Sequence, residues 1–411
     1  MSEEKKLVPK LRFPEFRGTA GWEDQSVGQY LEDCSGRVPP DTELPVYSST
    51  REGLKRQDAY FDGQVLQNKN EYGVVPPACF VYRHMSDDGL FKFNINETGG
   101  DIAVSKEYPV FRTRGVNPVF LLAKLNDGPD FKRFALSQKA GGTRTRLYFS
   151  RLCEWRTPLP LSTEQQKIAD CLSSLDELIA AQARKVDALK THKKGLMQQL
   201  FPREGETQPR LRFPEFRDAG EWVNEPLGEL GEVITGKTPS TKESELWGGD
   251  ILFITPTDIS EDEKYQQATA RKVVETKSTK VLPTGSIVYT CIASIGKMAL
   301  TVGPSITNQQ INAVVPNKKT AGEFIYYALL NLTPWIKTIP ASSTLPIINK
   351  TEFSKIVIGY SEDKDEQQRI AACLTSLDTL ITTATQELET LKTHKKGLMQ
   401  QLFPSAEAVQ A

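Results

Sequence analysis

The sequence has few of the residues on which metal sites and most covalent catalysis depend. It contains only three histidines, and none of its six cysteines forms a CxxC pair: Cys34, Cys79, Cys153, Cys171, Cys291 and Cys373. Metal-ligand spacing is therefore absent, and this cysteine usage is typical of a reducing, cytoplasmic protein. No run of eighteen apolar residues predicts a transmembrane helix, and the polar first residues do not form a secretory signal.

A strong net charge is also missing, since the formal charge is −1. The charge is nevertheless unevenly distributed. Residues 112–151 carry nine Lys and Arg against two Asp, and residues 271–319 carry seven against one Glu, whereas residues 243–263 are acidic. A locally basic face is suited to a phosphate backbone, but a solvated surface of mixed charge explains the pattern equally well.

An internal repeat dominates the sequence. The residues THKKGLMQQLFP at 191–202 recur at 393–404, and LRFPEF at 11–16 recurs at 211–216. The offsets of 202 and 200 residues are far longer than a solenoid repeat. The chain is therefore predicted to contain two copies of a unit made of one domain and one helix.

Each copy contains a long stretch with apolar residues at alternating spacings of four and three, which predicts a coiled-coil seam. Ser162–Thr163 and Asp363 are candidate N-caps, and Pro202 and Pro404 end the stretches. A lone apolar seam needs a partner, and the simplest partner is the other copy, in an antiparallel pair with a pseudo-twofold axis. The predicted seam residues are Ile168, Leu172, Leu175, Ile179, Val186 and Leu189 in the first copy, and Ile370, Leu374, Leu377, Ile381, Leu388 and Leu391 in the second.

The two middle regions share almost no sequence, but both are α+β in character. Short β-branched and aromatic runs between turn residues predict strands, and one run predicts a helix. The strands are expected at 73–82, 115–125, 250–255, 285–291 and 310–315, and the helix at 324–332. The predicted boundaries are 1–160 for the first domain, 161–202 for the first helix, 203–361 for the second domain, 362–404 for the second helix and 405–411 for a tail.

Several of these segments resemble the specificity subunits of type I restriction-modification systems, over nearly the whole chain. The resemblance lies in the paired LRFPEF openings, the EQQ(K/R)IA helix starts at Glu164 and Glu366, and the repeated helix ends. It extends to TGKTPS, WGGDILFITPTDI and TNQQINAVVP at 235–240, 247–259 and 307–316, and to VYSSTREGLKRQDAYF and VSKEYPVF at 46–61 and 104–111.

The resemblance implies an α+β fold with two globular target-recognition domains separated by two long antiparallel coiled-coil helices in a pseudo-twofold internal repeat. It implies a non-catalytic protein that binds double-stranded DNA at a bipartite asymmetric target and directs adenine-N6 methylation and restriction. The implied partners are two methyltransferase (modification) subunits and restriction/translocase subunits, without a membrane. S-adenosylmethionine, ATP and Mg are expected on those partners and no cofactor on this chain.

Candidate DNA contacts follow from the chemistry of base and phosphate recognition, in which Arg and Lys bind guanine or phosphate and Asn and Gln bind adenine. Internal hydrogen bonding of residues 308–310 is an equally good interpretation of that segment. The candidates are Arg51, Lys55, Arg56, Arg112, Arg114, Lys132, Arg133, Arg144 and Arg146 in the first half, and Lys237, Thr238, Lys242, Lys297, Asn308, Gln309 and Gln310 in the second.

Two short motifs suggest other functions. GEVITGKT at 231–238 fits the nucleotide-binding pattern GxxxxGK[ST], but Pro239 follows at once and Gly248–Gly249 would end any helix, so a surface loop near DNA is favoured. NPVF at 117–120 is similar to an amino-methyltransferase loop, yet no glycine-rich cofactor loop precedes it. A tight turn is the preferred interpretation. A scaffold that binds no DNA is the remaining alternative.

Overall fold

A computed structural model describes residues 7–39, 42–60, 72–139, 144–203, 205–276, 279–339 and 346–404. The chain forms two compact units. The first combines Met1–Ala181 with Leu388–Ala411, and the second is Gln182–Glu387. Each unit thus contains one globular part and a portion of both long helices. Of the helices described, none combines the length and apolar character needed to cross a membrane.

The two long helices are α5 (Ser162–Leu200) and α9 (Lys364–Leu402), each of 39 residues. None of the twelve predicted seam side chains is exposed, and seven are buried. Asp363 caps α9 as predicted, because its Oδ1 accepts the Asp365 N–H at 2.9 Å. The expected cap of α5 is wrong: Ser162 and Thr163 lie inside the helix, and the Leu161 carbonyl accepts the Glu164 N–H at 3.0 Å.

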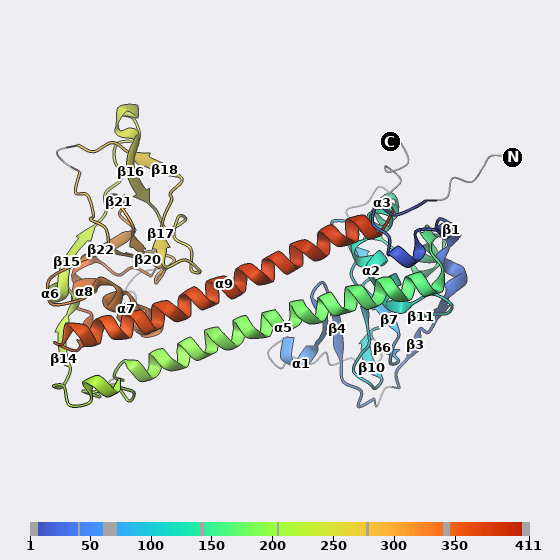
Figure 1. Cartoon of the computed structure of the whole chain (residues 1–411), viewed down its shortest axis with the longest axis horizontal. Helices are drawn as coiled ribbons and strands as arrows, with labels where there is room; N and C mark the ends of the chain where they lie inside the picture. The colour runs from blue at the N-terminus through green and yellow to red at the C-terminus, as the bar shows by residue number, and fades with distance from the viewer. Residues whose placement is uncertain are drawn as a thin grey trace. The chain divides into compact units, whose positions relative to one another are not determined.

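Within each unit the two helices run in opposite directions (Figure 1). In the first unit Ile168 and Leu172, near the start of α5, share a core with Leu402 at the end of α9. In the second unit Leu200, at the end of α5, shares a core with Ile370 near the start of α9. The predicted antiparallel pairing is therefore present in both units.

The globular part of the first unit is built from short antiparallel strands packed on helices. One sheet has the order β2-β11-β7-β9 and another β10-β6-β3, and the remaining strands form the two-stranded pairs β1-β13, β4-β5 and β8-β12. Its core is rich in aromatic side chains, including the stacked rings of Phe80 and Phe111. The elements are η1 (Pro14–Phe16), β1 (Glu23–Ser26), η2 (Val27–Tyr30), β2 (Leu31–Asp33), β3 (Gly36–Arg37), β4 (Tyr47–Thr50), β5 (Gly53–Arg56), α1 (Gln57–Tyr60), β6 (Tyr72–Val75), β7 (Phe80–Tyr82), β8 (Met85–Ser86), β9 (Phe93–Ile95), β10 (Ile102–Ser105), β11 (Val110–Thr113), α2 (Pro118–Asp127), α3 (Pro129–Ser137), β12 (Thr145–Arg146), α4 (Phe149–Cys153) and β13 (Arg156–Leu159).

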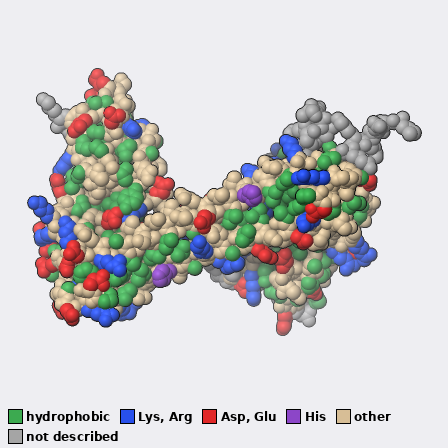
Figure 2. Space-filling view, viewed as in Figure 1, with side chains coloured by type: hydrophobic (Ala, Val, Ile, Leu, Met, Phe, Trp, Pro, Cys, Tyr) green, Lys and Arg blue, Asp and Glu red, His purple; other side chains and the backbone are tan. Residues whose placement is uncertain are grey.

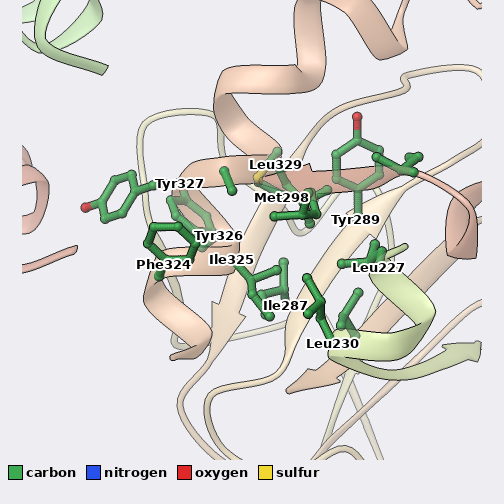
Figure 3. Packing of buried hydrophobic residues seen from close by; sticks show 14 of the residues in the cluster. Leu227, Leu230, Ile287, Tyr289, Met298, Phe324, Ile325, Tyr326, Tyr327 and Leu329 are labelled. Atoms are coloured by element: carbon green, nitrogen blue, oxygen red, sulfur yellow. The ribbon is translucent and has the colours of Figure 1, made fainter. Parts of the chain in front are cut away.

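The globular part of the second unit has a larger sheet of mixed direction, with the order β15-β22-β19-β20-β17. A second sheet has the order β18-β16-β21, and β14 pairs with β23. Figure 3 shows how α7 lays Phe324, Ile325 and Leu329 into a cluster with side chains of the large sheet. The elements are η4 (Pro214–Phe216), β14 (Val223–Pro226), α6 (Leu227–Leu230), β15 (Gly231–Thr235), η5 (Ser244–Leu246), β16 (Trp247–Ile254), β17 (Tyr265–Gln266), β18 (Arg271–Val273), β19 (Ile287–Thr290), β20 (Met298–Thr301), β21 (Ser305–Thr307), β22 (Ile311–Pro316), α7 (Gly322–Ile336), α8 (Lys350–Ser354) and β23 (Val357–Tyr360).

Residues 115–125 are a correction to the sequence prediction, because most of this apolar run forms α2 rather than a strand. Asn117 caps the helix, since its Oδ1 accepts the Phe120 N–H at 3.0 Å, and Pro118 occupies the first turn. The NPVF segment is thus a helix start and not a tight turn. A short apolar run without clear periodicity does not distinguish a buried strand from a buried helix.

Candidate nucleic-acid interface

A buried ion pair fastens each entry segment to a long helix. Arg12 donates to both carboxylate oxygens of Glu164 at 2.8 and 2.7 Å, and its side chain is 5% exposed. In the second unit Arg212 binds Glu366 in the same bidentate way, at 2.7 Å for both bonds. Hydrogen bonding to the Glu164 carboxylate raises the pKa of the Arg12 guanidinium, so the charge persists at any physiological pH. Each LRFPEF segment thus supplies the arginine of one ion pair, and each EQQ segment supplies its glutamate. We call the pairs Arg12–Glu164 and Arg212–Glu366 the lock.

The glutamine after each of these glutamates positions a helix of the globular part, α2 in the first unit and α7 in the second. The Gln165 Oε1 accepts the N–H of Asn117 at 2.9 Å, immediately before α2. The Gln367 Oε1 accepts the N–H of Ala321 at 2.8 Å, immediately before α7. Two globular parts of unrelated sequence are therefore held to the long helices by identical chemistry.

The entry segments also pair with helix ends. The Leu211 N–H donates to the Gln199 carbonyl of α5 at 2.9 Å, and the Leu11 N–H donates to the Gln401 carbonyl of α9 at 3.0 Å. In the second unit the two partners are neighbours along the chain, and in the first they are its opposite ends. The contacts of the repeat are therefore cyclic, because the second entry segment binds the end of α5 and the first binds the end of α9.

Several candidate cations of the first unit gather around residues 85–92, between β8 and β9. Arg144 binds Asp87 at 2.8 Å, Arg51 binds Asp88 at 2.7 Å, and Arg146 lies opposite Met85 in the β8-β12 pair. Arg51 and Lys132 line a cleft of about 270 Å³ together with Lys92. Lys92 is a basic residue that the sequence prediction missed, because it stands alone between Phe91 and Phe93 and carries no local signal of binding.

The other candidates of the first unit do not join this group by any contact among the described residues. Arg112 and Arg114 both pair with Glu32, and the hydrogen bond from Arg112 lowers the pKa of that carboxyl group. Lys55 pairs with Glu52, and Arg56 with Asp58 at 3.0 Å. Arg133 is exposed on α3.

In the second unit three loops meet at one edge of the large sheet. The loop at 236–238 packs on the turn before β22, where Thr238 Oγ1 donates to Gln309 Oε1 at 2.7 Å. A Cβ on Gly236 would lie 2.2 Å from the Asn308 carbonyl oxygen, so only glycine fits there. Lys297 joins the same edge through the β19-β20 turn, because the Thr290 N–H donates to its carbonyl and the Cys291 N–H to that of Gln310.

Within this group the side chains have different roles. Asn308 is 9% exposed and holds the turn internally, since its Oδ1 accepts the Gln310 N–H at 3.1 Å and its Nδ2 donates to Gln310 Oε1 at 3.0 Å. Gln309 and Lys237 are exposed, and so is Lys242. Internal hydrogen bonding therefore describes Asn308 and Gln310, whereas the exposed Gln309 side chain is held only by the bond that its Oε1 accepts from Thr238 among the described residues.

The nucleotide-binding interpretation of residues 231–238 is wrong on geometric grounds. β15 supplies the preceding strand, but a phosphate loop also needs a helix whose N-terminal amides face the phosphate. Residues 236–246 are all described, and their only helical segment is the three-residue η5. The loop instead packs against Thr307 and Asn308.

The candidate Lys and Arg side chains differ in whether an acidic side chain already forms an ion pair with them. Of the residues that the structure describes, none places a carboxylate within 4 Å of Lys92, or of the candidates Lys132, Arg133, Arg146, Lys237, Lys242 and Lys297. The other charged candidates each have an acidic partner. Figure 2 shows that Lys, Arg, Asp and Glu are interspersed over the visible face of both units. The surface is therefore of mixed charge, with some cations that have no carboxylate partner within the described part of the chain.

Comparison with known families agrees with this construction. The family model described as the type I restriction modification DNA specificity domain matches residues 95–191 and 219–393, which is more than half of the chain. The chain belongs to this family. The first stretch covers the later part of the first globular part and most of α5, and the second covers most of the second globular part and most of α9. The family pattern therefore occurs twice in the chain.

Individual relatives carry the same name. The chain is 33% identical over 179 residues to the type I restriction enzyme MjaIX specificity subunit of Methanocaldococcus jannaschii, and 36% identical over 143 residues to the HindI specificity subunit of Haemophilus influenzae. These alignments span 41% and 31% of the relatives' lengths. A putative MjaX specificity subunit from the same archaeon is 24% identical over 78% of this chain and 79% of its own length.

Solved structures support the fold. The S subunit of a type I restriction-modification system from M. genitalium superposes with a TM-score of 0.60 at 16% identity, over 97% of this chain and 100% of its own. A chain from a study of complex assembly and conformational transition in a type I R-M system gives 0.58 at 17% identity, over 97% and 99%. Mixed α and β content in two repeated domains is therefore the architecture of this chain.

Proposed function

We propose that this chain is the DNA-reading subunit of a type I restriction-modification system. Each globular part reads one half of a split, asymmetric DNA target, and the paired helices α5 and α9 act as a coiled-coil spacer that sets the unread gap. The observation that carries this function is the lock built twice from Arg12–Glu164 and Arg212–Glu366, which mounts two globular parts of different sequence on equivalent helices. Two different reading domains on one symmetric frame match a bipartite, asymmetric site.

Catalysis belongs to partner subunits in this proposal. Two methyltransferase subunits dock on the repeated helices, and restriction/translocase subunits add cleavage. S-adenosylmethionine, ATP and Mg bind to those subunits and not to this chain. Membership of the specificity family supports this division.

A methylation map tests the function directly. The chain is co-expressed with its methyltransferase in a host without other adenine methylation, and N6-methyladenine is mapped across the genome. The expected result is one motif made of two short defined sequences separated by unspecified bases. A continuous motif, or no methylation with an active methyltransferase, would contradict the proposal, and the chain alone should methylate nothing.

The unpaired cations provide a test at the level of residues. Lys132→Gln and Lys237→Gln should each weaken DNA binding by the assembled methyltransferase and lower the slope of log affinity against log salt by about one. Arg112→Gln is the matched control, because Arg112 is already neutralised by Glu32 and should change the slope little. Equal effects of all three substitutions would show that an ion pair in the free protein does not decide whether a cation contacts DNA.

A further inference from the structure

The two units are anchored unequally at equivalent positions of the long helices. Asp176 of α5 and Asp378 of α9 are 202 residues apart, the offset of the repeat, and each forms an ion pair with the opposite helix. Lys395 binds Asp176 at 2.6 Å, and Lys193 binds Asp378 at 2.5 Å. The Asp176 side chain is 55% exposed and that of Asp378 only 24%.

The difference comes from the globular part of the second unit. The Tyr327 hydroxyl on α7 donates to Asp378 Oδ2 at 2.6 Å and lies 3.1 Å from Thr375 Oγ1. Figure 3 shows the Tyr327 ring at the rim of the apolar cluster, with its hydroxyl pointing away from the other side chains. Among the described residues, no side chain of the first globular part forms a hydrogen bond with Asp176.

A second set of contacts, made by Lys264, lies at the same position along α9. Lys264, just before β17, donates to Thr375 Oγ1 at 2.6 Å and pairs with Glu323 at 3.1 Å, and Tyr265 donates to the same carboxylate at 2.5 Å. The Lys264 ammonium also lies 4.7 Å from the centre of the Tyr327 ring. Burial opposes ionisation of Glu323, but hydrogen bonds from Tyr265 and Lys264 outweigh it and lower its pKa. The group is thus satisfied and charged at neutral pH.

The first unit has no counterpart of Tyr327 at the equivalent position of α2. Tyr327 lies six residues after Ala321, and the corresponding residue six after Asn117 is Ala123. Alanine has no hydroxyl to reach Asp176. Burial raises the pKa of Tyr327, so its hydroxyl keeps the proton that it donates to Asp378.

We propose that Tyr327 is a positioning residue, which fixes the second recognition domain on the helix pair through Asp378 and thereby makes the length of the unread gap part of what is recognised. The proposal rests on the proposed function. The Arg212–Glu366 pair and the Gln367 bond hold the domain at the first turns of α9. The bond of Tyr327 to Asp378 lies about three turns further along α9, and this second contact limits rocking of the domain about the first. Discrimination between gap lengths then depends on Tyr327, while discrimination between bases depends on the domain's own loops.

The experiment uses the full chain assembled with its methyltransferase and a set of DNA targets with the two half-sites intact and the gap shortened or lengthened by one base pair. Tyr327→Phe removes the hydroxyl and keeps the ring. The expected result is a loss of roughly fivefold in the preference for the correct gap, the scale of one net hydrogen bond, with unchanged preference for the half-site bases. Asp176→Asn, the matched control, should leave gap preference as in the wild type.

Thermal unfolding separates positioning from stability. If Tyr327→Phe lowers the melting temperature but leaves gap preference unchanged, Tyr327 has a purely structural role and the proposal is overturned. Altered preference for the half-site bases would overturn it as well. Should Tyr327→Phe not fold, Thr375→Ala removes the neighbouring contact of Lys264 and is expected to relax gap preference in the same direction, and an unchanged preference there counts against the proposal. A wild-type complex that methylates no split target would instead refute the proposed function itself.

Discussion

Lys124 shows most clearly how an individual side chain escapes prediction from sequence. It counts among the nine basic residues of 112–151, yet it is fully buried, 3.0 Å from Asp130. Its ammonium lies between 5.4 and 5.9 Å from the ring centres of Trp22, Trp155 and Phe403. Burial lowers its pKa. A residue that the sequence assigns to a basic surface is thus part of the core where α9 ends.

Removing the partner of this lysine should be costly. Asp130→Asn leaves a buried ammonium without its counter-charge, and we expect the free energy of unfolding of the first unit to fall by about 3–5 kcal/mol. Chemical denaturation followed by the fluorescence of Trp22 and Trp155 measures this. The double variant Lys124→Met, Asp130→Leu should regain most of the loss, because the charge and its partner are removed together.

The same pair predicts sensitivity to acid. Burial opposes ionisation of Asp130, but Lys124 and hydrogen bonds outweigh it, so its pKa in the folded protein lies below the ordinary value of 3.8. A carboxyl group with a depressed folded pKa stabilises the fold above its unfolded pKa and loses that contribution as the pH falls through the folded one. The wild type should therefore lose stability below about pH 4, more steeply than Asp130→Asn. Parallel curves from pH 7 to pH 2 would contradict this.

At the level of the elements, the long helices are the part that the sequence predicts best. Their alternating apolar spacing and repeated ends depend only on local periodicity, and Ile168 and Ile370 are each 1% exposed in equivalent places. The α2 helix was predicted as a strand because its apolar residues show no clear period. The contacts that join Gln165 to α2 and Gln367 to α7 depend on the tertiary fold, so no local pattern reveals them.

The seam can be tested with two leucines of the same helix. Leu374 is fully buried and Leu380 is 54% exposed. Leu374→Ala should destabilise the second unit by about 2–5 kcal/mol, because it removes buried methyl groups and leaves a cavity. Leu380→Ala should change stability by no more than about 0.5 kcal/mol. The denaturant concentration at the midpoint of unfolding measures both effects, provided that the free energy of unfolding of the two variants depends equally on denaturant concentration.

Replacing Gly195 or Gly397 should stabilise the protein, in contrast to the variants above. Both lie inside long helices, and a Cβ added at either would have no neighbouring atom within 4 Å. Glycine costs roughly 1 kcal/mol relative to alanine within a helix. Gly195→Ala and Gly397→Ala should therefore each raise the free energy of unfolding of the isolated chain by about 1 kcal/mol. A destabilised variant would mean that the helix bends at this point.

At the level of the whole molecule, the architecture follows from the repeat, but the recognition surface does not. The sequences that form the lock can be recognised because each occurs twice in the chain. Each globular part has its own sequence, so it has no second copy with which it can be compared. The structure brings Arg51 and Lys132 to one cleft, pairs Arg112 with Glu32, and turns Asn308 inward. Arg51, Arg144 and Arg112 have acidic partners 37, 57 and 80 residues away in the sequence. A list of basic residues therefore cannot separate paired from unpaired cations.

The spacer role that we propose for α5 and α9 can be tested by changing the length of both helices. Seven residues inserted at equivalent points of both long helices keep the seam in phase and lengthen each by roughly 10 Å. The methylated motif should then keep both half-sites and gain up to about three base pairs of gap, at 3.4 Å per base pair. The methylation map of the altered strain provides the answer, and changed half-sites with the original gap would contradict a spacer role.

The discontinuity of the first unit has a consequence during synthesis. Residues 1–181 leave the ribosome before the whole of the second unit, residues 182–387, and their remaining partners Met399, Leu402 and Phe403 come last. At 5–20 residues per second this interval lasts roughly 10–40 s. The second unit, continuous in sequence, can close first. The nascent first half must meanwhile keep the apolar surface around Ile168 and Leu172 from aggregating until the final turns of α9 arrive.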